Sequence, residues 1–101
     1  MITDAMNTLN NITGGELTLG KAIRAIRLGD EIKQGDFAEM LHVTQSYLSD
    51  IENDRKEVSP QKAAEMAKIL GYSEKQFIRL AVQDGLRRKG FHYEIEVHDA
   101  V

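Results

Sequence analysis

The segment QGDFAEMLHVTQSYLSDIE, from Gln34 to Glu52, has the spacing of two short helices joined by a tight turn, and the second helix is polar on one side. At a helical spacing of about 100° per residue, Tyr47, Leu48 and Ile51 fall on an inward arc. The outward arc carries amide, hydroxyl and carboxylate groups that donate or accept hydrogen bonds, at Gln45, Ser46, Ser49, Asp50 and Asn53. This local pattern favours a recognition surface and a merely solvated helix face equally.

Catalytic chemistry has no support in the sequence. Cysteine is absent, so a thiol nucleophile, a thiolate zinc site and a disulfide framework are all excluded. No Ser-His-Asp arrangement, phosphate-binding loop or paired-carboxylate pocket is apparent. Near the end of the chain His92, Glu94, Glu96 and His98 share one face, but their spacing is too long for a compact metal cluster, which favours a solvated face. We therefore expect no enzyme activity, no metal and no cofactor.

The composition is that of one small globular domain. Of the 101 residues, 42% are hydrophobic and 29% are charged, which suits a single core and is neither disordered nor membrane-like. No apolar run approaches the roughly 18 residues of a membrane-spanning helix. The start of the chain lacks the basic residues and apolar centre of a signal peptide. We therefore expect a cytoplasmic protein.

Capping residues and apolar periodicity predict three helices in the first half of the chain. They span about 18–29, 34–41 and 44–53, and the first and third are capped by Thr18 and Thr44. The second helix is expected to bury Phe37, Ala38, Met40 and Leu41. Its small Ala38 falls where two crossed helices meet closely, so a larger side chain there would push them apart.

Two further helices have clear start signals. Ser59 and Pro60 begin the fourth, which carries apolar residues at helical spacing and ends at Gly71. The fifth begins with a capping box and a hydrophobic staple, formed by Ser73 with Gln76 and by Tyr72 with Phe77.

The last part of the chain is predicted to contact another subunit or protein. On the fifth helix some apolar residues project away from the core side. In the tail FHYEIEVHDAV, apolar residues alternate with polar ones, which predicts a β-strand that cannot stand alone. That strand must pair with its two-fold mate, with the N-terminal arm or with another protein. The expected contact residues are Ile78, Val82, Leu86, Phe91, Tyr93, Ile95 and Val97.

Three motifs together resemble the phage-repressor-like helix-turn-helix family, known as the XRE or Cro type. LGKAIRAIR, FAEMLHVTQSYLSDIEN and SPQKAAEMAKILGYS occur in the family's order and with its spacing. The resemblance covers Thr18 to about Leu86 and implies an all-α, five-helix DNA-binding domain, here followed by a C-terminal β-strand arm. The chain would then divide into a flexible N-terminal arm at 1–17, the helix-turn-helix domain at 18–86 and a strand arm at 87–101 for dimer or partner contact.

The resemblance implies that the third helix, about 44–53, enters the major groove of DNA. The side chains suit that role, because glutamine can pair with adenine by two hydrogen bonds and basic residues neutralise phosphates. The family often links its first and third helices by an ion pair, which falls here on Arg27 and Glu52. The implied DNA-binding residues are Gln34, Thr44, Gln45, Ser46, Tyr47, Ser49, Asp50, Asn53, Arg55 and Lys56.

Two turn residues and the net charge depart from a simple DNA-binding pattern. His42 stands where the family usually has glycine with a positive φ, and Asp54 likewise replaces a frequent glycine. The net charge is −3. Because DNA meets only one face, a few basic residues could still make that face locally positive. The candidates are Arg24, Lys33, Arg55 and Lys56.

Three functions remain open at this point. The first is a homodimeric, sequence-specific transcriptional regulator, in particular a repressor, of a two-fold double-stranded DNA operator. The second is an antitoxin of a type II toxin–antitoxin system, similar to the HigA type, that neutralises a small basic RelE/HigB-like toxin and represses its own operon. The negative net charge, the polar N-terminal arm and the predicted C-terminal strand without a partner favour the second function. The third is a protein-only adaptor that has lost DNA contact.

Overall fold

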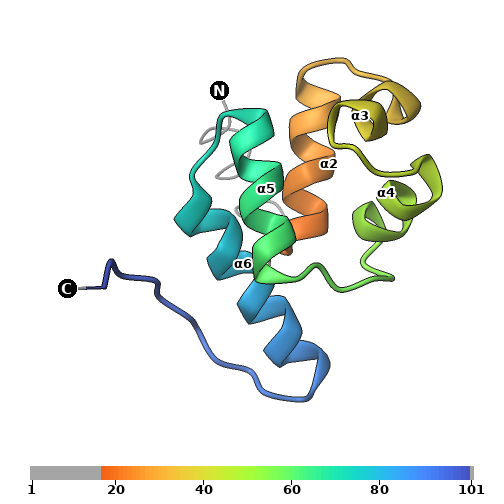
Figure 1. Cartoon of the computed structure of the whole chain (residues 1–101). Helices are drawn as coiled ribbons and strands as arrows, with labels where there is room; N and C mark the ends of the chain where they lie inside the picture. Colours follow the sequence, from red (N-terminus) through yellow and green to blue (C-terminus); the bar gives the residue numbers. More distant parts are fainter. Residues whose placement is uncertain (1–16, 101) are drawn as a thin grey trace. The chain divides into compact units, whose positions relative to one another are not determined.

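The computed structural model describes residues 17–100 of the chain. The chain divides after Lys56 into two compact units. No helix in the described part is long and apolar enough to cross a membrane. The predicted arm at 1–17 lies outside the described residues except for Leu17. Within 17–100 there are five helices, labelled in Figure 1 as α2 (Leu19–Gly29), α3 (Gln34–Met40), α4 (Gln45–Glu52), α5 (Pro60–Leu70) and α6 (Glu74–Arg88).

The first unit contains α2, α3 and α4, and α4 packs against both of the others. Thr18 caps α2, since its Oγ1 accepts a hydrogen bond of 3.1 Å from the backbone N–H of Lys21. The two helices α2 and α4 approach closely at Gly20, where an added Cβ would overlap the carbonyl oxygen of Ile51. The buried apolar residues of these helices are Leu19, Ala22, Ile23, Ile26, Phe37, Ala38, Leu41, Leu48 and Ile51.

A tight turn joins α3 to α4. The N–H of Val43 donates to the carbonyl of Ala38 over 3.0 Å, and Thr44 caps α4 by accepting from the N–H of Tyr47 over 3.1 Å. Met40 is 44% exposed, so the expectation that it is buried is wrong. It lies roughly 100° around the helix from the mean direction of its buried neighbours, because each residue advances by about that angle.

The second unit contains α5 and α6, which pack against each other. Both starts agree with the sequence prediction, because Ser59 and Ser73 accept hydrogen bonds from the N–H groups three residues onward. The α5 helix ends at Leu70, and Gly71 caps it in the left-handed conformation, with a φ of 77°. The rings of Tyr72 and Phe77 lie 6.2 Å apart, as a hydrophobic staple requires. The buried apolar residues of this unit are Val58, Ala63, Met66, Ala67, Phe77, Leu80 and Ala81.

The predicted C-terminal β-strand is wrong, because residues 17–100 contain no strand. The tail instead follows α6 in the opposite direction. Its Ile95 N–H donates to the side-chain oxygen of Gln83 over 3.1 Å, and Asp99 pairs with Lys75 at 2.9 Å. A strand must bond a neighbouring strand along its whole length. Here the neighbour is a helix, whose main-chain groups are already bonded within itself.

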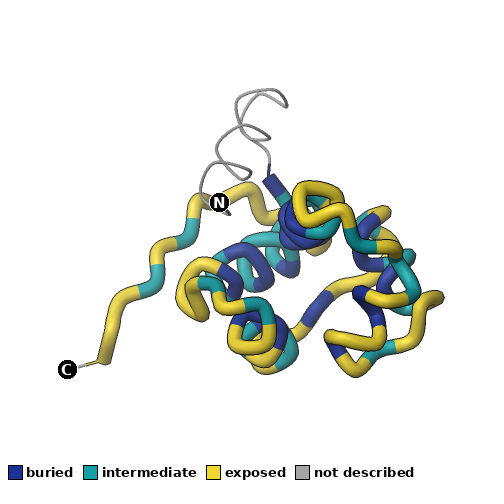
Figure 2. Tube along the Cα trace, turned by 90° about the horizontal axis from the view of Figure 1, so that it is seen from above, coloured by how far each residue is buried: buried dark blue, intermediate teal, exposed yellow. Residues whose placement is uncertain are grey.

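The predicted contact residues differ in exposure. Phe91 is 51% and Tyr93 is 65% exposed, and Figure 2 shows most of the tail in the exposed colour. The remaining predicted contact residues, Ile78, Val82, Leu86, Ile95 and Val97, are half-buried. Their role in a dimer or partner contact stays a prediction.

Candidate nucleic-acid interface

The outward side of α4 and the loop that follows it carry nearly all the predicted DNA-binding residues, and all of them lie in the first unit. Leu48 and Ile51 are buried and hold the helix in place. Gln34, at the start of α3, is half-buried. Half-buried on α4 are Tyr47, Ser49 and Asp50. Exposed on or beside α4 are Thr44, Gln45, Ser46, Asn53, Arg55 and Lys56.

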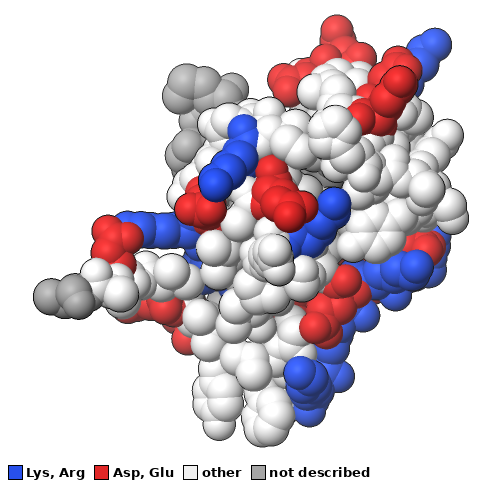
Figure 3. All heavy atoms as spheres, in the orientation of Figure 1, with Lys and Arg blue, Asp and Glu red and all other residues white. Residues whose placement is uncertain are grey.

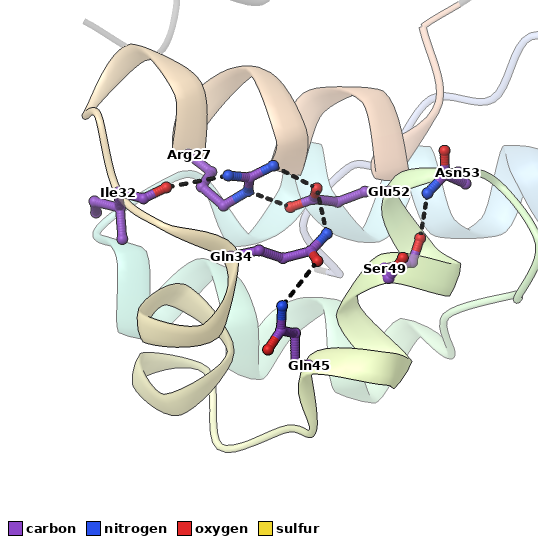
Figure 4. Close-up of polar contacts among 7 residues, drawn as sticks. All are labelled: Arg27, Ile32, Gln34, Gln45, Ser49, Glu52 and Asn53. Carbon is purple, nitrogen blue, oxygen red and sulfur yellow. Dashed lines mark hydrogen bonds and ion pairs between the residues drawn. The ribbon is translucent and has the colours of Figure 1, made fainter.

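A buried ion pair lies beneath this surface. Arg27 on α2 donates to Glu52 on α4 through Nε over 2.8 Å and through Nη2 over 2.9 Å, while its Nη1 donates to the carbonyl of Ile32 over 3.1 Å (Figure 4). The side chains of Arg27 and Glu52 are only 13% and 1% exposed. The hydrogen bond to Glu52 raises the pKa of Arg27, against the opposing effect of burial. The predicted ion pair is therefore present and joins α2 to α4.

Gln34 connects this pair to the surface. Its Nε2 donates to Glu52 over 3.1 Å, and its Oε1 accepts from Nε2 of Gln45 over a longer distance of 3.4 Å (Figure 4). The carboxylate of Glu52 can only accept, so the orientation of the Gln34 amide is fixed. Among the described residues Gln45 makes no other side-chain hydrogen bond. Its Oε1 and one N–H therefore remain for a ligand.

Asp50 holds two basic residues of the following loop. Its Oδ1 lies 2.9 Å from Nε of Arg55, and its Oδ2 lies 4.0 Å from Nζ of Lys56. The Arg55 N–H also donates to the carbonyl of Asp50 over 2.8 Å, and Nζ of Lys56 lies 5.5 Å from the ring centre of Tyr47. This cluster was not predicted from the sequence, from which Asp50, Arg55 and Lys56 were expected only to contact DNA.

The turn at Asp54 makes that cluster possible. Asp54 has a φ of 57°, which turns the chain back beside α4, and its Oδ1 accepts from Oγ1 of Thr18 over 2.7 Å. His42 has a φ of 58°, as its position in the family pattern predicts. Glu31 also has a positive φ, of 56°, which the sequence analysis missed. Asn53 donates from its side chain to the carbonyl of Ser49 over 2.8 Å.

The charge of the candidate interface is less positive than the sequence suggested. Arg24 and Lys33 are exposed and form no ion pair with any described residue. Arg55 and Lys56, by contrast, lie within ion-pair distance of Asp50. The space-filling view in Figure 3 shows acidic as well as basic groups at the surface. Strong attraction to any polyanion is therefore not expected from charge alone.

Two short helices joined by a tight turn, with buried apolar residues below and polar residues outward on the second, define a helix-turn-helix protein. The chain belongs to the XRE-type helix-turn-helix family, whose model, described as helix-turn-helix, matches residues 23–77. Searches among curated proteins and among solved structures found no match. Family membership supports a DNA-binding transcriptional regulator.

Proposed function

We propose that the protein is a transcriptional repressor that binds a two-fold DNA operator as a homodimer, with α4 of each copy in the major groove. The outward ridge of α4 carries this proposal. Exposed Gln45 and Ser46 and half-buried Ser49 present hydrogen-bonding groups there, on the side opposite to buried Leu48 and Ile51. A helix of this diameter fits the major groove, where each base pair offers a distinct set of donors and acceptors.

Gln45 is the proposed adenine contact. Its Nε2 is bonded to Gln34 through one hydrogen, and the remaining oxygen and N–H match the amino group and N7 of adenine. Ser46 and Ser49 are proposed to bond base edges, and Thr44 and Gln34 to lie beside the DNA backbone. Phosphate contact is assigned to Asn53, Arg55 and Lys56.

Homodimer formation is proposed because one short helix contacts few base pairs, and two copies double the readable sequence. The second unit offers apolar groups for this contact, namely half-buried Ile78, Val82 and Leu86 on α6 and the exposed rings of Phe91 and Tyr93 in the tail.

A gel shift against the DNA upstream of its own gene, at several salt concentrations, tests the proposal. Specific retardation that weakens with salt is expected for the unaltered protein. A double variant, Gln45→Ala with Ser49→Ala, should lose about tenfold or more in affinity, given roughly 1–3 kcal/mol for each good base contact. The control is Gln61→Ala on α5, an exposed glutamine of the second unit, which should bind normally. A protein-only adaptor would give no specific band at any salt concentration.

The exposed tail favours the antitoxin as a second candidate. The rings of Phe91 and Tyr93 stack 6.4 Å apart and are largely exposed. The residues that follow include three acidic groups and no lysine or arginine, at Glu94, Glu96 and Asp99. Such a surface suits a small basic protein.

Deleting residues 91–101 separates the two candidates. If the shortened protein still dimerises but no longer rescues cells from a toxin encoded by the neighbouring reading frame, the antitoxin hypothesis is supported. Loss of the dimer instead supports self-association of the tail. A rescue that is unchanged by the deletion contradicts a role of the tail in toxin binding.

A further inference from the structure

The carboxylate of Asp50, which is half-buried on α4, already has two basic partners. One oxygen is 2.9 Å from Nε of Arg55 and the other is 4.0 Å from Nζ of Lys56. The backbone bond from Arg55 to the carbonyl of Asp50 keeps the loop beside α4. The two cations most suited to phosphate contact are therefore held by an acidic group on the recognition helix.

We propose that Asp50 determines DNA specificity by restraining Arg55 and Lys56 until a base offers an amino group to its carboxylate. This inference rests on the proposed DNA-binding function. The ligand it selects is a duplex with the exocyclic amino group of cytosine or adenine facing Asp50 in the major groove, since only these groups donate hydrogen bonds there.

The exposure of the cluster makes this exchange feasible. The side chains of Arg55 and Asp50 are 58% and 26% exposed, and Lys56 is 55% exposed. Exposed ion pairs contribute little to stability and are screened by salt. A base amino group can therefore replace Arg55 at the carboxylate without disturbing the core, and the guanidinium is then released toward a phosphate.

On a DNA sequence that offers no amino group to Asp50, its carboxylate acts against binding. Non-specific affinity comes from the neutralisation of phosphates by basic side chains. As long as Asp50 retains Arg55 and Lys56, their charge is partly cancelled. A guanine or thymine edge facing Asp50 presents acceptors, which repel a carboxylate instead of bonding it. Asp50 thus links the identity of one base to the strength of the phosphate contacts.

The test compares Asp50→Asn with the unaltered full chain on two duplexes, the upstream DNA and a scrambled sequence of equal composition, by fluorescence anisotropy at several salt concentrations. The variant should bind the scrambled duplex about tenfold or more tightly, with a log–log salt slope steeper by about one to two, because each freed cation releases about one counterion. Its preference for the upstream DNA should fall. Glu39→Gln is the control, since Glu39 is an exposed carboxylate of α3 that forms no ion pair within residues 17–100.

Three outcomes of this comparison overturn the inference. If the unaltered protein binds the upstream DNA specifically but Asp50→Asn leaves scrambled binding unchanged, the inference fails and the proposed function stands. If Glu39→Gln has the same effect as Asp50→Asn, total charge explains the change. Should the unaltered protein bind neither duplex, both the proposed function and the inference fail.

The contribution of the two cations is tested in a second background. When Arg55→Ala and Lys56→Ala are already present, Asp50→Asn should raise the affinity for the scrambled duplex by much less than tenfold. A full gain in that background would show that Asp50 acts without them, and the proposed restraint would be wrong. Circular dichroism should show that every variant remains folded.

Discussion

Two carboxylates of α4, only two residues apart, each form an ion pair, one buried and the other exposed to solvent. The Glu52 side chain is 1% exposed and its partner Arg27 is 13% exposed, with contacts of 2.8 and 2.9 Å. The Asp50 side chain is 26% exposed and its partner Arg55 is 58% exposed, with one contact of 2.9 Å. Both pairs join a carboxylate to a guanidinium. They differ in position, because the Glu52 pair lies on the inner side of α4 and the Asp50 pair on its outer side. We expect this difference to give them different roles.

Burial explains this difference. A buried charge that loses its partner cannot regain its hydration, so the pair must stay intact in the folded state. An exposed charge that loses its partner is solvated by water at little cost. The inner pair therefore stabilises the fold, whereas the outer pair can exchange its partner when DNA binds. Changes on the inner side should lower stability, and changes on the outer side should alter DNA binding in a folded protein.

The largest expected effect is on the inner side. Glu52→Ala removes the partner of Arg27 and should lower the free energy of unfolding by about 3–5 kcal/mol, as measured by urea denaturation. Because the pKa of Arg27 is raised, its charge stabilises the fold from neutral pH up to the ordinary arginine pKa, and this contribution is lost as pH rises through the raised value. The stability lost in Glu52→Ala should therefore be the same from neutral to mildly alkaline pH.

A double variant sharpens this result. Arg27→Met with Glu52→Leu replaces both charges by apolar groups, which often restores the stability lost in the single variant. If Glu52→Ala costs no more than an exposed substitution, the inner pair is not structural and the comparison fails.

The second effect concerns the close approach of α2 and α4. Gly20→Ala places a Cβ against the carbonyl oxygen of Ile51, so the helices must shift, at a cost of about 1–3 kcal/mol. Gly29→Ala in the same helix is the matched control, because an added Cβ there meets nothing within 4 Å. It should be neutral or stabilise by about 0.5–1 kcal/mol. Equal urea midpoints for the two variants would contradict the close packing.

Gln34 is bonded both to buried Glu52 and to exposed Gln45. Its replacement should therefore affect both stability and DNA binding. Gln34→Ala removes a hydrogen bond to Glu52 and the support of Gln45. We expect a loss of about 1 kcal/mol in stability together with weaker operator binding. In a double-mutant cycle with Gln45→Ala, the binding losses should not add, because the two residues are in contact. Additive losses would show that Gln34 does not position Gln45.

The features that the sequence predicted well depend on local interactions. Thr18, Thr44 and Ser73 each cap a helix by a bond to the third residue onward, so the signal lies within four residues. The Arg27–Glu52 pair spans 25 residues and was predicted only through the family resemblance. The DNA contacts themselves stay predictions.

The features that the sequence did not predict depend on distant or conformational information. The residues from Phe91 to Val97 alternate between apolar and polar, as in a strand. A strand also needs a neighbouring strand to pair with, and the local sequence does not show whether one is present. The pairing of Asp50 with Arg55 depends on the positive φ of Asp54. The family pattern marked Asp54 as a position that is often glycine, but it did not show which side chains the turn would bring together.

The smallest expected effects test those turns. His42 and Asp54 have nearly the same φ, 58° and 57°, and glycine adopts that conformation without strain. His42→Gly should therefore stabilise the protein by about 0.5 kcal/mol, after allowance for the greater freedom of the unfolded chain. Asp54→Gly should gain less or lose stability, since it also removes the 2.7 Å bond from Thr18. Urea midpoints that rise equally would show that this bond contributes nothing to the turn. Because only the Asp54 turn carries the loop of the outer ion pair, only Asp54→Gly should also change the salt dependence of DNA binding.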